Sequence, residues 1–127
     1  MDKRELQERT REFALRIVRL YAALPQQGAA QVLGKQLLRC GTSVGANYRA
    51  ACLGKSAADF ANKIKICEEE ADETLYWLGL LIDGGIMQEH LLAPLLDEAR
   101  QISAIMCAAA KTAQANRNLK QYLVHST

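Results

Sequence analysis

The sequence predicts an all-α protein, specifically an antiparallel up-down-up-down four-helix bundle. Half of the 127 residues are hydrophobic but only 6% are aromatic, which is a composition typical of helix bundles. The two prolines, Pro25 and Pro94, leave room for a few long elements. Apolar residues recur at spacings of three, four and seven, and no alternating strand pattern competes. The length suits a single domain, residues 1–127.

The first helix is expected over residues 3–24, where the apolar positions fall on one helical stripe. These positions are Leu6, Phe13, Ile17, Leu20 and Leu24. Pro25 ends the helix because it cannot continue the backbone hydrogen-bonding pattern. Gln26-Gln27-Gly28 then forms the turn.

The second helix is expected over residues 29–53. Its stripe is Leu33, Leu37, Cys40, Val44, Asn47 and Ala51. Gly34, Gly41 and Gly45 lie close to one face, although each lowers helix propensity by about 1 kcal/mol relative to alanine. Small residues on one face let another backbone approach closely. We therefore expect a tight helix–helix contact there, either within the chain or between chains.

The third helix is expected over residues 57–83, and the fourth over 89–116. Ser56 is suited to capping the start of the third, and Gly84 to ending it. The third stripe comprises Phe60, Ile64, Cys67, Ala71, Leu75, Leu78 and Ile82; the fourth comprises Leu92, Leu95, Ala99, Ile102, Met106 and Ala109. Residues 117–127 are expected to form a polar, frayed tail.

Charge is unevenly distributed along the chain. Residues 1–66 carry a balance of +7, residues 67–100 a balance of −8, and residues 101–127 a balance of +3. Mutual neutralisation inside a bundle would account for this pattern. A basic surface left free for nucleic acid is the functional alternative.

The cysteines and the chain start favour a cytoplasmic location. Cys40, Cys52, Cys67 and Cys107 have no C-x-x-C spacing and no nearby histidine, so we expect buried reduced thiols and no metal or other cofactor. The N-terminus has no signal-peptide core. The longest apolar stretch, Leu75 to Ile82, is too short to span a bilayer, so no membrane partner is expected.

Polar residues on the second and third helices are expected to form an interhelical or intersubunit network. The candidates are Arg39, Ser43, Asn47, Arg49, Lys63, Glu69, Glu70 and Glu73. Paired carboxylates can also bind metal or move protons, but ion pairing with arginine and lysine is the preferred interpretation. A buried Asn47 would need a partner such as Thr74 or Ser43 to fix helix register.

Aromatic and basic residues outside the stripes are candidates for recognition. Tyr48, Tyr76 and Trp77 are the candidate subunit contacts, because adjacent aromatics cannot both face one core. If copies of the chain stack their basic residues around an oligomer, the candidate nucleic-acid contacts are Arg16, Arg19, Lys35, Lys111 and Lys120.

No pattern predicts an enzyme. A di-iron bundle needs Glu-x-x-His pairs, which are missing from the sequence, and there is no glycine-rich phosphate loop. The charges and the aromatics therefore point to a binding protein. Its partner is either RNA or DNA or another protein, in which case the chain is an interaction scaffold.

Several segments resemble a known bacterial family, the four helix bundle proteins, also called the S23 or 23S rRNA-intervening sequence protein family. The matching segments are Gln36-Leu37-Leu38-Arg39, Ser43–Ala51, Lys55-Ser56, Asp59-Phe60, Lys63-Ile64 and Glu69–Leu78, together with Pro25. An acidic residue and a glycine follow the asparagine segment in many members. Here Ala50-Ala51-Cys52-Leu53-Gly54 stands in their place, which indicates a subgroup.

The resemblance implies a homo-oligomer and no catalytic residues. The family is similar to the accessory variability determinant of diversity-generating retroelements, a ring-shaped homopentamer that binds nucleic acid and a reverse transcriptase. Similarity to it implies a homopentameric ring with nucleic-acid or protein binding.

Overall fold

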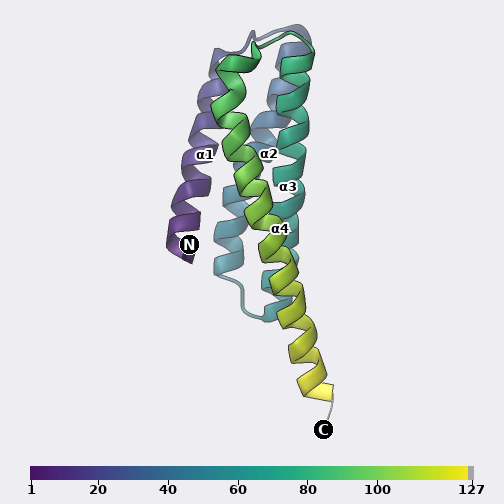
Figure 1. Cartoon of the computed structure of the whole chain (residues 1–127). Helices are drawn as coiled ribbons and strands as arrows, with labels where there is room; N and C mark the ends of the chain where they lie inside the picture. The colour runs from purple at the N-terminus through teal and green to yellow at the C-terminus, as the bar shows by residue number, and fades with distance from the viewer. Residues whose placement is uncertain (126–127) are drawn as a thin grey trace.

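The computed structural model describes residues 1–125, which form four α-helices and no strand (Figure 1). The helices are α1 (Lys3–Ala23), α2 (Gly28–Cys52), α3 (Ala57–Asp83) and α4 (Glu89–His125). Consecutive helices run in opposite directions and lie side by side. The prediction of an all-α four-helix fold is thereby confirmed. Over the described residues, none of these helices combines the length and apolar character needed to cross a membrane.

The helix ends follow local sequence signals. The Asp2 carboxylate caps α1 by accepting a hydrogen bond from the Glu5 backbone N–H at 2.8 Å. The Ser56 hydroxyl accepts one from the Asp59 N–H at 3.0 Å and starts α3, as the sequence predicts. Gly28 takes a φ of +64° at the start of α2, a conformation that strongly favours glycine.

The core runs the length of the bundle between the helices. Its largest fully buried side chains are Phe13, Ile17, Leu37, Val44, Ile64, Leu78, Leu81, Ile102 and Met106. Two buried threonines join them. The Thr10 hydroxyl donates to the Leu6 carbonyl at 2.9 Å, and the Thr74 hydroxyl to the Glu70 carbonyl at 2.7 Å. Both therefore meet the requirement that buried polar groups be hydrogen-bonded.

The glycines of α2 bring that helix close to α1 within the same chain. A Cβ on Gly41 would lie 2.9 Å from Cγ1 of Ile17, and one on Gly45 would lie 3.2 Å from Oγ1 of Thr10. A Cβ on Gly34 would lie 3.0 Å from the Leu24 side chain. The sequence left open whether this tight contact lies within the chain or between chains. The structure shows it within the chain.

The predicted stripe of α2 is wrong near its C-terminal end. Tyr48 is buried, with 5% exposure, whereas Asn47 is half-buried and lies to one side of the core. The Asn47 amide donates to the Ser43 carbonyl of its own helix at 2.8 Å, so it does not fix register across the core. From Val44 the core continues four residues on, where the larger Tyr48 ring buries more apolar area. Tyr48 is therefore not a surface available for a subunit contact.

The predicted polar tail is also wrong where the structure describes it. α4 continues to His125, nine residues past its predicted end, and residues 126–127 of that tail lie outside the described residues. No glycine or proline occurs after Ala109, and most residues there are good helix formers, so nothing stops the helix. Four exposed apolar residues also contradict its polar character: Leu119, Tyr122, Leu123 and Val124.

Adding one methyl group at Gly41 and at Gly79 should change stability in opposite directions. Gly41→Ala places a Cβ against the buried Ile17 side chain and should lower the free energy of unfolding by about 1–3 kcal/mol, despite better helix propensity. Gly79 lies inside α3 with nothing within 4 Å of an added Cβ, so Gly79→Ala should raise it by about 1 kcal/mol. Urea unfolding followed by circular dichroism measures both. Equal stability of the two variants would contradict the close α1–α2 contact.

Candidate functional site

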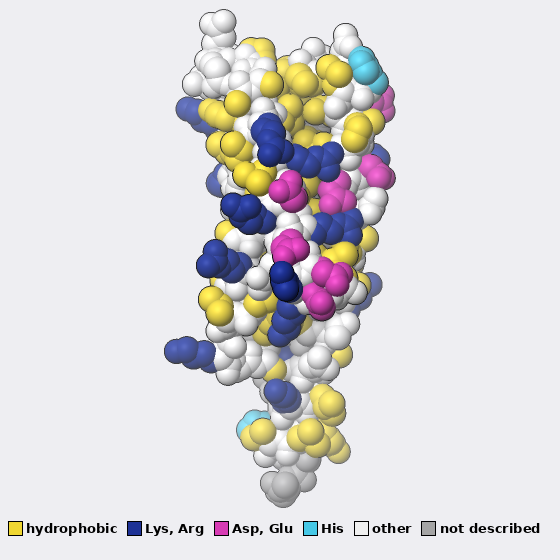
Figure 2. Space-filling view, turned by 90° about the vertical axis from the view of Figure 1, so that its left-hand side faces the viewer, with side chains coloured by type: hydrophobic (Ala, Val, Ile, Leu, Met, Phe, Trp, Pro, Cys, Tyr) yellow, Lys and Arg dark blue, Asp and Glu magenta, His cyan; other side chains and the backbone are white. Residues whose placement is uncertain are grey.

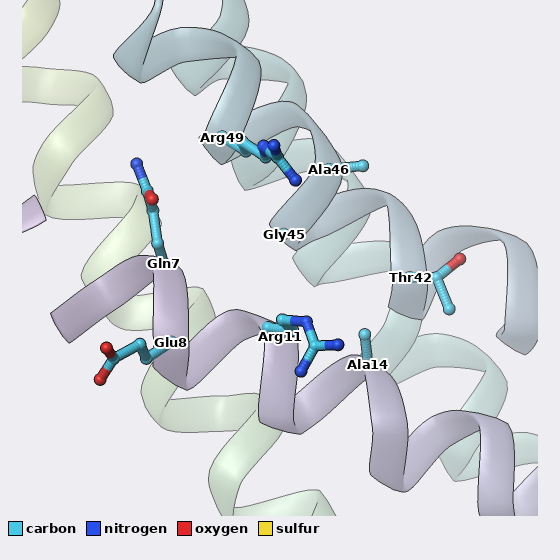
Figure 3. Close-up of a pocket in the computed structure, with 8 residues that line it drawn as sticks. All are labelled: Gln7, Glu8, Arg11, Ala14, Thr42, Gly45, Ala46 and Arg49. Carbon is cyan, nitrogen blue, oxygen red and sulfur yellow. The ribbon is translucent and has the colours of Figure 1, made fainter. Parts of the chain in front are cut away.

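A hollow lies between α1 and α2 on the surface of the bundle (Figure 3). Its volume is about 430 Å³. It is lined by Gln7, Glu8, Arg11 and Ala14 from α1 and by Thr42, Gly45, Ala46 and Arg49 from α2. The hollow exists because Ala14, Gly45 and Ala46 have too little side chain to fill the groove between the two backbones.

Two arginines face this hollow from opposite helices. Arg11 and Arg49 are exposed, and within residues 1–125 neither has a carboxylate partner at salt-bridge distance. Glu8 also lines the hollow, but its carboxylate points away from α2 and accepts from Nε of Arg4 at 3.3 Å (Figure 3). The guanidinium groups are thus free to hold an anion, for which their planar donor geometry is suited.

The rest of α2 adds to this positive character. Besides Arg49, the helix contains Lys35 and Arg39 and no acidic residue, with the charge of Arg39 bound by glutamates of α3. The sequence prediction assigned Arg49 to an interhelical network, whereas the structure places it at the hollow. Arg11 was missed because Glu8 and Glu12 share its part of the sequence. The signal that would have found it is the run of small residues opposite it on α2.

A second cluster joins α2 to α3 through Arg39. Its Nη2 lies 2.7 Å from both carboxylate oxygens of Glu73, and its Nη1 lies 3.3 Å from Glu70. The hydrogen bond from Arg39 lowers the pKa of Glu73, while burial raises the pKa of Glu70. The structure therefore brings together three of the predicted network residues.

The same cluster holds the one group of potential metal ligands found among residues 1–125. The Cys40 sulfur and the Glu70 and Glu73 carboxylates lie within 4.8 Å of one another. Burial raises the pKa of the Cys40 thiol, which favours its protonated form, and its sulfur lies 3.3 Å from the Thr74 hydroxyl oxygen. Arg39 already supplies the positive charge that these carboxylates need. The donor set is better suited to an ion-pair network than to a cation.

The other predicted network residues make local contacts. The Ser43 hydroxyl donates to the Arg39 carbonyl at 2.6 Å within α2. Lys63 pairs with Asp59 one turn earlier on α3, at 2.5 Å, and not with α2. Glu69 is exposed on the outer side of α3. These residues do not join the two helices.

The two predicted aromatics of α3 differ in their exposure. Tyr76 is 61% exposed, as a surface contact would require. Trp77 is half-buried against the core, and among residues 1–125 its buried Nε1 has no hydrogen-bond partner. The two rings meet edge to face, with their centroids 5.1 Å apart.

The predicted nucleic-acid contacts are spread over several faces. Arg16 is half-buried near Glu98 of α4, and Arg19 and Lys35 are exposed on α1 and α2. Lys111 and Lys120 are exposed on α4. On the face shown in Figure 2, acidic side chains lie among the basic ones in the middle and on the right, so this face is not uniformly basic.

An ion pair that the sequence did not reveal connects α1 to α4. Arg9 donates to both carboxylate oxygens of Glu98, at 2.7 and 2.9 Å, and also to Oε1 of Gln101 at 2.7 Å. The Arg9 and Glu98 side chains are 24% and 20% exposed. The hydrogen bond lowers the pKa of Glu98. α1 contacts α4 much less than it contacts α2, so this pair is a main link between them.

Comparison with known proteins places this geometry in a family. The sequence model of the 23S rRNA-intervening sequence protein family matches residues 2–108. Among solved structures, the chain is similar to a protein of unknown function from the S23 ribosomal protein family of Bacteroides thetaiotaomicron. The two are 39% identical with a TM-score of 0.78, over 84% of this chain and 98% of that one. No curated protein matches the sequence.

Removing the Glu98 carboxylate should reveal its contribution to stability against acid. The pKa of Glu98 is lower in the folded state than the unfolded value of about 4.3, so its ion pair stabilises fully above that pH. The contribution is lost as the pH falls through the folded-state pKa. Glu98→Gln should cost about 1 kcal/mol at neutral pH, and the difference from wild type should shrink below about pH 4.

Urea unfolding at a series of pH values measures this effect. Glu8→Gln is the matched control because its partner Arg4 is largely exposed, so its effect should stay within about 0.5 kcal/mol. A Glu98→Gln penalty that is the same at every pH would contradict the assignment.

Proposed function

Since the chain belongs to the 23S rRNA-intervening sequence protein family, we propose that it is a non-catalytic protein that binds nucleic acid as a homo-oligomer. The observation that carries the proposal is the pair Arg11 and Arg49 facing one hollow without a carboxylate partner among the described residues. In this proposal the hollow receives a backbone phosphate.

The chemistry of the hollow supports phosphate over other anions. Two guanidinium groups offer several donors in planar geometry, which matches the oxygens of a phosphate group. Gln7 also lines the hollow, and its amide can donate hydrogen bonds to phosphate or sugar oxygens. The small Gly45 and Ala46 let a bulky backbone approach α2 closely. Such contacts hold a nucleic acid without reading its sequence.

Self-association would turn a weak single site into useful affinity. One hollow with two arginines contributes few phosphate contacts, whereas several copies acting together gain from effective concentration. The proposed assembly is the homopentamer that the family resemblance suggests. Five chains of 14.0 kDa would have a mass of 70 kDa.

A protein-interaction scaffold is the second candidate function. The outer side of α3 favours it, because Tyr76 is 61% exposed and Ile66 40% exposed, beside the exposed acids Glu69 and Asp72. The exposed aromatic side chain suits a protein partner, and the acidic residues around it repel the phosphates of a nucleic acid.

Removing the two arginines of the hollow should weaken nucleic-acid binding in a salt-dependent way. For Arg11→Ala/Arg49→Ala, the slope of log affinity against log salt should fall by about 0.7–0.9 for each lost phosphate contact. Fluorescence anisotropy with labelled RNA and DNA, single-stranded and duplex, measures it. Lys65→Ala is the control, since it removes a charge that is paired with Glu68 on α3. If the wild-type protein does not bind RNA or DNA at low salt, nucleic-acid binding is contradicted and the protein-interaction scaffold becomes the proposed function.

A further inference from the structure

The C-terminal part of α4 is an addition to the region shared with the family. Residues 109–125, here called the α4 extension, follow the end of the family match at residue 108. The end of the extension projects beyond the other three helices (Figure 1). It contains Lys111, Arg117 and Lys120 and no acidic residue. The start of the extension still packs on the bundle, where Ala113 is 4% exposed, but its last turns continue into solvent, and their presence is not explained by the stability of the bundle.

One side of the extension is apolar and exposed. Tyr122 and Leu123 follow Leu119 by three and four residues, so the three side chains share one face of the helix. Their exposed fractions are 56%, 67% and 58%. Neighbouring large apolar side chains that are left in water mark a surface that associates with a partner.

The same chain carries a surface of complementary character on α3. Ile66, Glu69 and Tyr76 are spaced three and seven residues apart along its outer side. Ile66 and Tyr76 are exposed apolar groups, and Glu69 and the nearby Asp72 are exposed acids. This outer face of α3 therefore offers apolar contacts and negative charge, which the basic α4 extension requires.

We propose that the α4 extension of one copy packs against the outer face of α3 in a second copy. Leu119, Tyr122 and Leu123 cover Ile66 and Tyr76 of the second copy, and the basic residues of the extension lie near its acids. The inference rests on the proposed self-association and names the surfaces that take part. The two surfaces differ, so each copy can use both, and this head-to-tail contact is the type from which rings are built.

Other occupants fit the extension less well. A nucleic acid would neutralise the basic residues but would leave Leu119 and Leu123 in water. Pairing of two extensions would bring six basic residues together without one acid. An anionic membrane could bind both the basic residues and the apolar face, so the experiment below also tests binding to anionic vesicles.

Charge reversal with rescue tests the contact. Lys111→Glu/Lys120→Glu reverses the extension, and Glu69→Lys/Asp72→Lys reverses the outer face of α3. All four sites are exposed, so the bundle should fold, which circular dichroism checks. Light scattering over a range of concentrations, without nucleic acid, gives the association constant. Each reversal should lower it at least tenfold, and the four substitutions together should restore it. Arg4→Glu, a single charge reversal on α1, should leave it unchanged.

The outcomes separate this contact from the proposed function. A monomeric wild type would overturn both the contact and the self-association. An oligomer that neither reversal weakens, or that weakens without rescue, would overturn the contact alone and leave the self-association in place. Binding to anionic phospholipid vesicles that is lost on Lys111→Glu/Lys120→Glu, with the mass unchanged, would assign the extension to a membrane and overturn the contact.

Discussion

The close approach of α1 and α2 is the constraint on which the rest of the structure depends. A Cβ added at Gly41 would lie 2.9 Å from the Ile17 side chain, and one added at Gly45 would lie 3.2 Å from the buried Thr10 side chain. The three glycines lower the intrinsic helix propensity of α2, but they allow two backbones to pack where larger residues would hold them apart. This contact also creates the hollow, since residues small enough to permit it leave unfilled space on the outer side.

The ion pairs then connect the remaining helices. Arg39 links α2 to the two glutamates of α3, and Arg9 links α1 to Glu98 of α4. Such pairs add little net free energy when they are exposed, but a bidentate geometry restricts how the helices can rotate or slide relative to one another. The α1–α4 side has sparse contacts, so the Arg9–Glu98 pair matters most there.

The sequence predicted the fold well because helix periodicity and end signals are local. Pro25, Ser56 and Gly84 lie at or next to the helix boundaries that the structure shows.

The site was predicted only in part. Arg39, Glu70 and Glu73 were named together because opposite charges at matching levels of neighbouring helices suggest a pair. The Arg11–Arg49 hollow and the Arg9–Glu98 pair depend on how α1 is rotated against its neighbours, and such a rotation has no local signal. The end of α4 was placed too early because the polar residues after Asn116 were interpreted as a frayed tail, although no glycine or proline interrupts the helix there.

The environment of Trp77 has an optical consequence. It is the one tryptophan of the chain, with its indole N–H enclosed, the Tyr76 ring at its edge and the Arg39–Glu73 pair one turn away. Its emission is therefore a built-in reporter for the junction of α2 and α3. Separation of these two helices would hydrate the indole and shift its fluorescence to the red, whereas loosening of α1 from α4 would leave the colour unchanged. The emission wavelength of Trp77 can thus distinguish whether α2 separates from α3 before α1 separates from α4.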